Sequence, residues 1–432
     1  MSASVKSVSQ DFDLGALKLK VILPMLTLNI GTNITEDSMS IQEVYIMSGA
    51  RTAIGDFGGA LKDFLGHQLV VHPMEEAIKR AKIRKEMVEE VILGHCIQRT
   101  DEPNTARTAA IKMGLPMSVP AFTVQRQCSS AMQAIASGAQ MIKLGEADVV
   151  IAGGVETMSS APYLLKTARW GQRLQHGQMA DTVWDVLTDP LNGMLMGAAT
   201  ELLAEKYKIT REEMDEVAYR SHKNASRAMA EGRFKDEIVP VPIAQRKGPP
   251  KIFDTDEHPR KDLSMEDLTK LPSVFKKGGT VTAGNSSGIN DGASAVVLMS
   301  GEKAQKLGLK PMARIVSYAW AALEPEYFGY GPVPATQKAL QRANLTLGDM
   351  ELIEVNEAFA GQYMACEKGL GLKREIVNVN GSGIALGHPV GSTGARIVIT
   401  LLYEMARRGL KMGLATLCVG GGMGMSMIVE RM

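Results

Sequence analysis

Residues 128–156 read CSSAMQAIASGAQMIKLGEADVVIAGGVE, and residues 387–424 read GHPVGSTGARIVITLLYEMARRGLKMGLATLCVGGGMG. Both stretches begin with small residues at the start of a helical pattern, continue into an apolar strand, and then reach a glycine pair. The two pairs, Gly153–Gly154 and Gly420–Gly421, lie about 267 residues apart. A repeated unit at this separation predicts a duplicated domain.

Runs rich in Val and Ile alternate with helical patterns along the chain, which is typical of an α/β protein with largely buried sheets. The expected strands are 43–48, 89–96, 121–126, 147–153, 294–300, 312–319, 351–355, 376–379, 413–419 and 424–430. The expected helices are 66–82, 105–114, 129–144, 335–344, 357–369 and 392–408.

The composition is that of a soluble globular protein. The chain has 432 residues, more than one hydrophobic core usually serves, so we expect two or more domains. Hydrophobic residues make up 45% and charged residues 22%, which argues against disorder, a membrane partner or a fibrous repeat. The net charge of +1 gives no reason to expect a nucleic-acid partner, so an anionic ligand must be met by local basic groups.

The pattern divides the chain into a leader, two halves and an insertion. Residues 1–41 are expected to be a loosely ordered leader. Residues 42–156 are expected to form the first half, with 276–300 completing its sheet, and residues 301–432 the second half. Residues 157–275 hold polar helices and proline-broken segments, so we expect a lid over the substrate, with a plain surface excursion as the alternative.

Neither the leader nor the cysteines indicate export. The one apolar run of the leader, 21–30, is too short to span a bilayer and lacks a small-residue cleavage site after it. Cys96, Cys128, Cys366 and Cys418 have no CxxC spacing, so we expect neither a disulfide framework nor a bound metal. A reducing, cytoplasmic location fits best.

Cys128 follows the apolar stretch AFTVQ and precedes two serines, so it should lie at or near a helix N-terminus. The free amides and the positive end of the helix dipole favour a thiolate there. We therefore expect the thiol pKa to fall below its usual value of about 8.5, and the same amides could hold an oxyanion. The alternative is a small buried apolar filler.

Three further residues lie where strands end or glycines gather. His388 stands in a Gly-His-Pro turn, from which an imidazole can take a proton from a thiol, although such a turn alone is usually structural. Cys418 ends the strand GLATLCV before three glycines whose amides can meet a negative charge, or it is a core residue. Asn356 precedes a helix. Its side chain either caps that helix, holds a water molecule or orients the imidazole of His388. A nucleophilic thiol, a base and a second thiol together make a carbon-acyl transfer site.

Six longer motifs carry a family resemblance that covers nearly the whole chain from about residue 42 onward. In chain order they are AGGVETMS (152–159), GRFKDEIVP (232–240), VTAGNSSGINDGA (281–293), NEAFA (356–360), GIALGHPVG (383–391) and CVGGG (418–422). Together they resemble the thiolase family. The resemblance implies the thiolase fold, with two duplicated βαβαβαββ halves in a five-layered α-β-α-β-α arrangement and an inserted lid subdomain.

The resemblance also implies a role for each candidate. Cys128 matches the acylated nucleophile, His388 its activating base, and Cys418 the thiol that moves the α-proton. Asn356 matches the side chain that holds a water in one oxyanion hole, and the backbone amides of Cys128 and Gly420 match the second hole.

A second set of positions is implied to bind coenzyme A or the acyl chain. The coenzyme contacts are Leu187, Arg260, Phe275, Ala283, Ser287, Ala358 and Phe359, and the acyl-pocket residues are Met196 and Phe328. Three positions depart from the pattern of some members: Leu195 replaces a histidine, Asp267 a serine and Phe328 a methionine. These changes put the acyl-chain preference in doubt.

The expected activity is reversible acyl transfer between CoA thioesters, with acetyl-CoA, acyl-CoA and CoA as partners and no permanently bound cofactor. Condensation of two acetyl-CoA molecules is the preferred reaction, and degradative cleavage of longer 3-ketoacyl-CoA in fatty-acid β-oxidation is the alternative. A decarboxylating condensing enzyme and an inactive scaffold are weaker alternatives. The resemblance further implies a homodimer or homotetramer.

Overall fold

The computed structural model describes residues 6–14, 17–25, 42–174 and 176–432, and the chain divides into two units, residues 1–41 and 42–432. In the first unit, β1 (Lys6–Leu14) and β2 (Leu17–Met25) pair antiparallel, a hairpin that the sequence pattern does not predict. The rest of the expected leader lies outside the described residues. In the described part of the chain, no helix is long and apolar enough to cross a membrane.

The first half of the second unit contributes five strands, in the order β6-β5-β7-β13-β3, to one continuous 11-stranded sheet, and these five strands are called the first sheet below. Strand β5 runs parallel to β6 and β7, whereas β13 runs antiparallel to both β7 and β3. The strands are β3 (Val44–Thr52), β5 (Glu90–Gly94), β6 (Ala121–Val124), β7 (Val149–Thr157) and β13 (Asn290–Ser300).

The second half contributes β15-β16-β17-β14, called the second sheet below, which joins the first where β14 pairs antiparallel with β3. Strand β15 runs parallel to β16, and β17 runs antiparallel to β16 and β14. The order and directions of β15, β16, β17 and β14 match those of β5, β7, β13 and β3, which shows that the domain is duplicated. The strands are β14 (Ala313–Ala322), β15 (Leu352–Val355), β16 (Met412–Val419) and β17 (Met423–Arg431).

The strand expected at 376–379 does not form, and that prediction is wrong. A single parallel bridge, Ile353 to Val377, occupies its place beside β15. Asn378 has a φ of 49°, outside the β region, and its side chain both accepts from the Val355 N–H and donates to the Val355 carbonyl. Side-chain hydrogen bonds thus replace the ladder that a regular strand would make.

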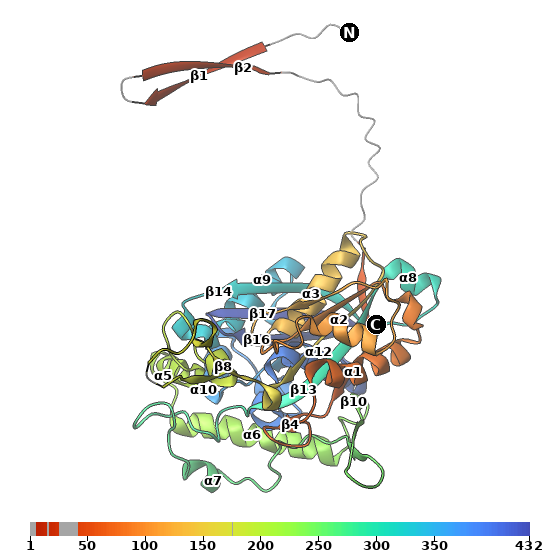
Figure 1. Ribbon diagram of the computed structural model, residues 1–432, viewed down its shortest axis with the longest axis vertical. Coiled ribbons are helices and arrows are strands. Elements are labelled where there is room, and N and C mark those ends of the chain that lie inside the picture. Colours follow the sequence, from red (N-terminus) through yellow and green to blue (C-terminus); the bar gives the residue numbers. More distant parts are fainter. Residues whose placement is uncertain (1–5, 15–16, 26–41, 175) are drawn as a thin grey trace. The chain divides into compact units, whose positions relative to one another are not determined.

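Helices cover both sheets and fill the space between them, which gives five layers (Figure 1). α1 and α2 pack on the first sheet, and α9 and α10 share an apolar core with the second. α3 and α12 contact each other in the core that both sheets share, and most of their residues are buried. The helices are α1 (Gly66–Ala81), α2 (Thr105–Lys112), α3 (Ser130–Lys143), α9 (Pro332–Ala343), α10 (Ala360–Leu370) and α12 (Val390–Arg408).

Most of the remaining short elements lie in the insertion between β7 and β13. Its long helix α6 begins at a capping box, in which Thr210 accepts from the Glu213 N–H and Glu213 accepts from the Thr210 N–H. The insertion contains β8 (Tyr163–Leu165), β9 (Met179–Asp181), α4 (Thr182–Val186), α5 (Met196–Tyr207), α6 (Arg211–Ala230), β10 (Ile238–Val239), β11 (Val241–Ile243), β12 (Lys251–Phe253) and α7 (Met265–Thr269). Outside it lie β4 (Gly55–Asp56), α8 (Gly301–Lys306) and α11 (Gly383–Leu386).

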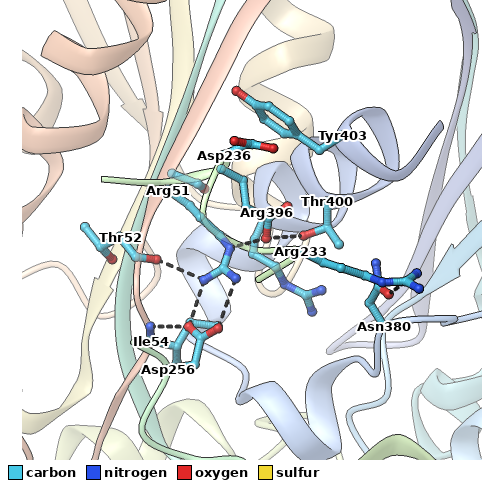
Figure 2. Close-up of polar contacts among 12 residues, drawn as sticks. Arg51, Thr52, Ile54, Arg233, Asp236, Asp256, Asn380, Arg396, Thr400 and Tyr403 are labelled. Carbon is cyan, nitrogen blue, oxygen red and sulfur yellow. Dashed lines mark hydrogen bonds and ion pairs between the residues drawn. The ribbon is translucent and has the colours of Figure 1, made fainter. Parts of the chain in front are cut away.

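A buried ionic cluster ties the insertion to the first sheet (Figure 2). Arg51 of β3 donates to both oxygens of Asp256, at 2.8 and 3.0 Å, and to Glu237 at 2.6 Å. Asp256 also accepts from the Ile54 N–H, and Thr400 of α12 donates to Glu237. All of these charges are fully buried, so each depends on its partners for stability.

Candidate active site

Cys128 lies in a tight turn between β6 and α3. Gln127, just before it, has a φ of 45°, a left-handed conformation that is uncommon for a residue other than glycine. The turn is closed by the Ser130 hydroxyl, which accepts from the Arg126 N–H at 2.8 Å and donates to the Gln127 carbonyl at 2.6 Å. α3 begins at Ser130, so the predicted position at a helix N-terminus is confirmed.

The predicted lowering of the Cys128 pKa is wrong, because burial raises it to about 11. The backbone N–H groups of Gly420 and of Cys128 itself favour the thiolate, but they do not offset the loss of solvation. The negative charge of Glu156 raises the pKa further. The resting nucleophile is therefore a neutral thiol that needs a base.

His388 is held in one orientation by the first turn of α12. Its Nδ1 lies 2.6 Å from Oγ1 of Thr393, and that hydroxyl donates to the Pro389 carbonyl at 3.0 Å. Because the hydroxyl proton is used in this way, Nδ1 carries the proton and Nε2 is left as an acceptor. Burial, with a contribution from the charge of Arg396, lowers the pKa of His388 to about 3, so the imidazole is neutral.

Asn356 is placed beside the imidazole and does not cap a helix. It follows β15, and its N–H donates to the Thr416 carbonyl at 2.9 Å. α10 begins only at Ala360, with Phe359 as its N-cap residue. The Asn356 Nδ2 lies 3.4 Å from Nε2 of His388, and its buried Oδ1 has no hydrogen-bond partner in the described residues. Such an oxygen can accept from a water, as the resemblance implies.

Cys418 is fully buried near the end of β16, opposite Gly424 of β17. Burial raises its pKa well above the usual value, and the nearby Cys128 thiol adds to this effect because two thiolates at this distance would repel each other. Gly421 and Gly422 follow with φ values of 75° each, a turn that only glycine adopts without strain.

Both cysteines lie near this glycine turn: the backbone N–H of Gly420, two residues after Cys418, favours the Cys128 thiolate, and ionisation of Cys128 would disfavour ionisation of Cys418. The part of Gly420 in an oxyanion hole stays a prediction.

The predicted acyl-pocket residues, Met196 and Phe328, belong to the same apolar cluster as Cys418. One apolar cluster contains Cys418, Phe328, Ala199 and Ala358, with Met194, Met196 and Phe359 packed against it. Phe328 is almost completely buried and its ring meets that of Phe359 edge to face, at 6.5 Å between centroids. Leu195, the departure from the pattern, is the N-cap residue of α5.

A cavity of about 520 Å³ contains part of the predicted coenzyme site. Its lining includes Arg260, Ala283 and Asp267. The Asp267 carboxylate belongs to the capping box of α7, in which it accepts from the Ser264 N–H. His222 and His258 also line it and were not predicted. These two histidines stand among polar residues without a motif, so the sequence carried no signal for them.

The other predicted coenzyme residues, with one exception, lie between the lining of this cavity and the apolar cluster around Cys418. Ser286 lines the cavity and forms a bridge with Phe359, and the next residue, Ser287, donates its N–H to the Ala358 carbonyl at 2.9 Å. Phe275 packs edge to face on Phe359, at 6.1 Å. Leu187 lies apart, in a separate apolar cluster with the residues Ile97, Met158 and Val183.

The chain matches two family models across nearly all of the second unit. Residues 44–302 match the thiolase N-terminal domain, and residues 309–431 match the thiolase C-terminal domain. The boundary between them falls between β13 and β14, where the structure changes from the first half to the second.

Proteins and solved structures of this kind are similar over the same length. An acetyl-CoA acetyltransferase from Syntrophomonas wolfei is 52% identical, covering 90% of this chain and 99% of that protein, and a β-ketothiolase from Cupriavidus necator is 49% identical over the same shares. The crystal structure of the Bacillus anthracis acetyl-CoA acetyltransferase is 54% identical with a TM-score of 0.90, covering 91% of this chain and 100% of that one. Human mitochondrial 3-ketoacyl-CoA thiolase in complex with CoA is 42% identical with a TM-score of 0.88, covering 91% and 98%. The chain belongs to the thiolase family.

Proposed function

We propose that the protein transfers acetyl groups between CoA thioesters and condenses two acetyl-CoA molecules to acetoacetyl-CoA and CoA, reversibly. The observation that carries this proposal is the pair of thiols near the glycine turn 420–422, Cys128 partly buried and Cys418 fully buried, with a neutral imidazole beside Asn356. Relatives named acetyl-CoA acetyltransferase, about half identical over nearly their whole length, support the same reaction.

The first half-reaction is thioester exchange. The Cys128 sulfur bonds to the acetyl carbonyl carbon while its proton passes to Nε2 of His388. The bond from that carbon to the CoA sulfur then breaks, and CoA leaves with the proton. The amides of Cys128 and Gly420 lie where an oxyanion forms, and one such donor is typically worth about 10²- to 10³-fold in rate.

The second half-reaction makes the carbon-carbon bond. Cys418 gives its proton to Nε2 of His388, which is free again once CoA has left. The resulting thiolate removes a proton from the methyl group of a second acetyl-CoA while the enolate carbon bonds to the acetyl carbonyl on Cys128. The bond to the Cys128 sulfur breaks, acetoacetyl-CoA leaves, and the proton that Cys418 gave up to form its thiolate returns to Cys128. A buried, apolar pocket disfavours free charge, so proton transfer and bond formation must be closely coupled.

Cleavage of longer 3-ketoacyl-CoA is the second candidate function. The human mitochondrial 3-ketoacyl-CoA thiolase is 41–42% identical with a TM-score of 0.88, so the fold suits either reaction. The wall that Phe328 and Met196 form around Cys418 favours the short substrate, because a longer chain would need the space that these side chains fill.

The test is thiolysis of 3-ketoacyl-CoA substrates with four to twelve carbons. We expect kcat/KM to be highest for acetoacetyl-CoA and to fall by about tenfold or more at six carbons. A maximum at eight carbons or longer would replace the short-chain assignment with the degradative one. No thiolysis of any substrate would refute both.

We further propose that the enzyme is a homodimer or homotetramer in a reducing, cytoplasmic compartment. β6 is the edge strand of the first sheet and exposes Phe122, and the insertion exposes Trp170, Leu174 and Trp184. Exposed edges and apolar patches of this kind favour self-association.

All four cysteines are free thiols. Coenzyme A enters as a substrate, with no resident cofactor required.

A further inference from the structure

Glu156 is a fully buried carboxylate that the reaction above does not use. It is the penultimate residue of β7 and has no exposed surface. Its oxygens accept three backbone N–H groups: Ile97 at 3.1 Å, Cys96 at 3.2 Å and Gly391 at 2.9 Å. These three hydrogen bonds stabilise the buried carboxylate, so Glu156 makes specific contacts and is not an unpaired buried charge.

Two of the donors lie on the segment after β5, which contacts the Cys128 turn, and the third lies on the segment that carries His388. Cys96 follows β5, and its thiol donates to the carbonyl of Gln127, the residue before Cys128, at 2.9 Å. Gly391 lies in the first turn of α12, two residues before the Thr393 that orients His388. One side chain therefore contacts the supports of both the nucleophile and the base, which belong to different halves of the duplicated domain.

The segments around Glu156 pack so closely that no side chain fits between them. A Cβ atom on Gly391 would lie 2.4 Å from the Val155 carbonyl and 2.9 Å from Oε2 of Glu156. A Cβ atom on Gly154 would lie 2.1 Å from the Gly391 carbonyl and 2.8 Å from Cβ of Ala131, in the first turn of α3. The first turns of α3 and α12 thus meet directly at the end of β7.

We propose that Glu156 is a positioning residue for the acyl-transfer reaction, which holds the Cys128 turn and the His388 loop against each other. This inference rests on the proposed function for its catalytic meaning. The contacts themselves do not depend on the substrate.

The groups that face Glu156 decide how its charge acts. His95 Nε2 lies 3.4 Å from Oε1, but burial lowers the pKa of His95 to about 4, so this ring is neutral. The remaining titratable neighbours are the thiols of Cys96 and Cys128, and Glu156 raises the pKa of both. Burial raises the pKa of Glu156 itself to about 7, so above neutral pH, where Cys128 titrates, the carboxylate is ionised. Removing its charge must then favour the Cys128 thiolate.

The test compares Glu156→Gln and Glu156→Asp with Glu90→Gln as a matched control. Glu90 is a buried carboxylate at the start of β5 whose side chain bonds only to the Val91 N–H among the described residues. Two readouts are measured: the pH profile of Cys128 alkylation by iodoacetamide, followed by mass spectrometry, and kcat and KM for acetoacetyl-CoA thiolysis.

We expect Glu156→Gln to shift the alkylation profile to lower pH by about half a unit or more, and to lower kcat by about 10- to 100-fold with little change in KM. Glu156→Asp keeps the charge but is too short to reach both segments. It should leave the alkylation profile in place and still lower kcat. Glu90→Gln should change neither readout.

A Glu156→Gln protein with the wild-type alkylation profile and wild-type kcat would overturn the inference. A lower melting temperature with an unchanged profile and kcat would reduce Glu156 to a structural role and overturn it as well. If Glu156→Gln does not fold, wild-type kcat in Glu156→Asp would equally overturn the inference. Failure of the wild-type enzyme to cleave acetoacetyl-CoA would instead refute the proposed function, and the alkylation profiles would still test the charge effect.

Discussion

The imidazole Nδ1 of His388 lies 2.6 Å from the hydroxyl oxygen of Thr393, and that hydroxyl in turn donates to the Pro389 carbonyl. This short chain fixes the proton on Nδ1 and turns Nε2 toward Asn356, at 3.4 Å. The first turn of α12 thus sets both the orientation and the tautomer of the His388 imidazole.

Replacing Thr393 by Val removes the hydroxyl while keeping the shape. We expect kcat for thiolysis to fall by about 10- to 100-fold with KM nearly unchanged, because Nδ1 and the Pro389 carbonyl lose their partner and the imidazole can turn or change tautomer. Steady-state kinetics check this. Thr393→Ser keeps the hydroxyl and should retain most of the activity, and equal losses in both variants would contradict the role of the hydroxyl.

Asp256 balances the buried charge of Arg51, since the pair is bidentate and almost no part of either side chain is exposed. Asp256→Ala should lower the free energy of unfolding by about 3–5 kcal/mol, because it leaves a buried guanidinium short of a partner and an Ile54 N–H without its acceptor. Urea denaturation measures the change. Glu266→Ala breaks an exposed pair with Lys270 and should cost about 1 kcal/mol or less. Similar losses in the two variants would contradict this account of the cluster.

Burial lowers the pKa of His222 to about 4, with smaller contributions from the charges of His258 and Arg260. The unfolded chain binds a proton at this residue below about pH 6.5, whereas the folded chain does so only near pH 4. The stability that His222 contributes is therefore present above pH 6.5 and is lost as the pH falls toward 4. We expect His222→Gln to show a shallower loss of melting temperature than the wild type between pH 6.5 and 4.5. Parallel curves would contradict the lowered pKa.

Phe328 closes the acyl pocket beside Cys418 and is almost completely buried. Phe328→Ala should raise the ratio of kcat/KM for a six-carbon over a four-carbon 3-ketoacyl-CoA by about tenfold, because it opens space for two more methylenes. The chain-length series measures this ratio. Phe253→Ala removes a buried ring of β12 that is not part of this pocket and should leave the ratio unchanged. An unchanged ratio in Phe328→Ala would place the specificity wall elsewhere.

The regular elements of both halves could be predicted from the sequence because their apolar periodicity is strong. The helix expected at 129–144 is Ser130–Lys143, and the strand expected at 413–419 is Met412–Val419. The strand expected at 376–379 does not form for a local reason. The Asn378 side chain makes the hydrogen bonds to the Val355 backbone of β15 that a paired strand would otherwise make.

The parts of the site that escaped prediction depend on distant segments. The helix terminus that would lower the pKa of Cys128 is visible in the sequence, whereas the burial that raises it is produced by packing and is not. Glu156 lies inside a motif that marks the family, but no local pattern indicates that Gly391, 235 residues away, donates to its carboxylate. Leu187 matches a coenzyme position by resemblance, yet its contacts are with a different cluster.

The central claim is that Cys128 carries the acyl group and Cys418 moves the proton. Intact-protein mass spectrometry after incubation with acetyl-CoA tests it on the wild type, Cys128→Ala and Cys418→Ala, alongside acetoacetyl-CoA formation. We expect one acetyl group on Cys128 in the wild type and in Cys418→Ala, none in Cys128→Ala, and acetoacetyl-CoA formation by the wild type alone. Stable acetylation of Cys128→Ala, or condensation by either variant at the wild-type rate, would contradict the account.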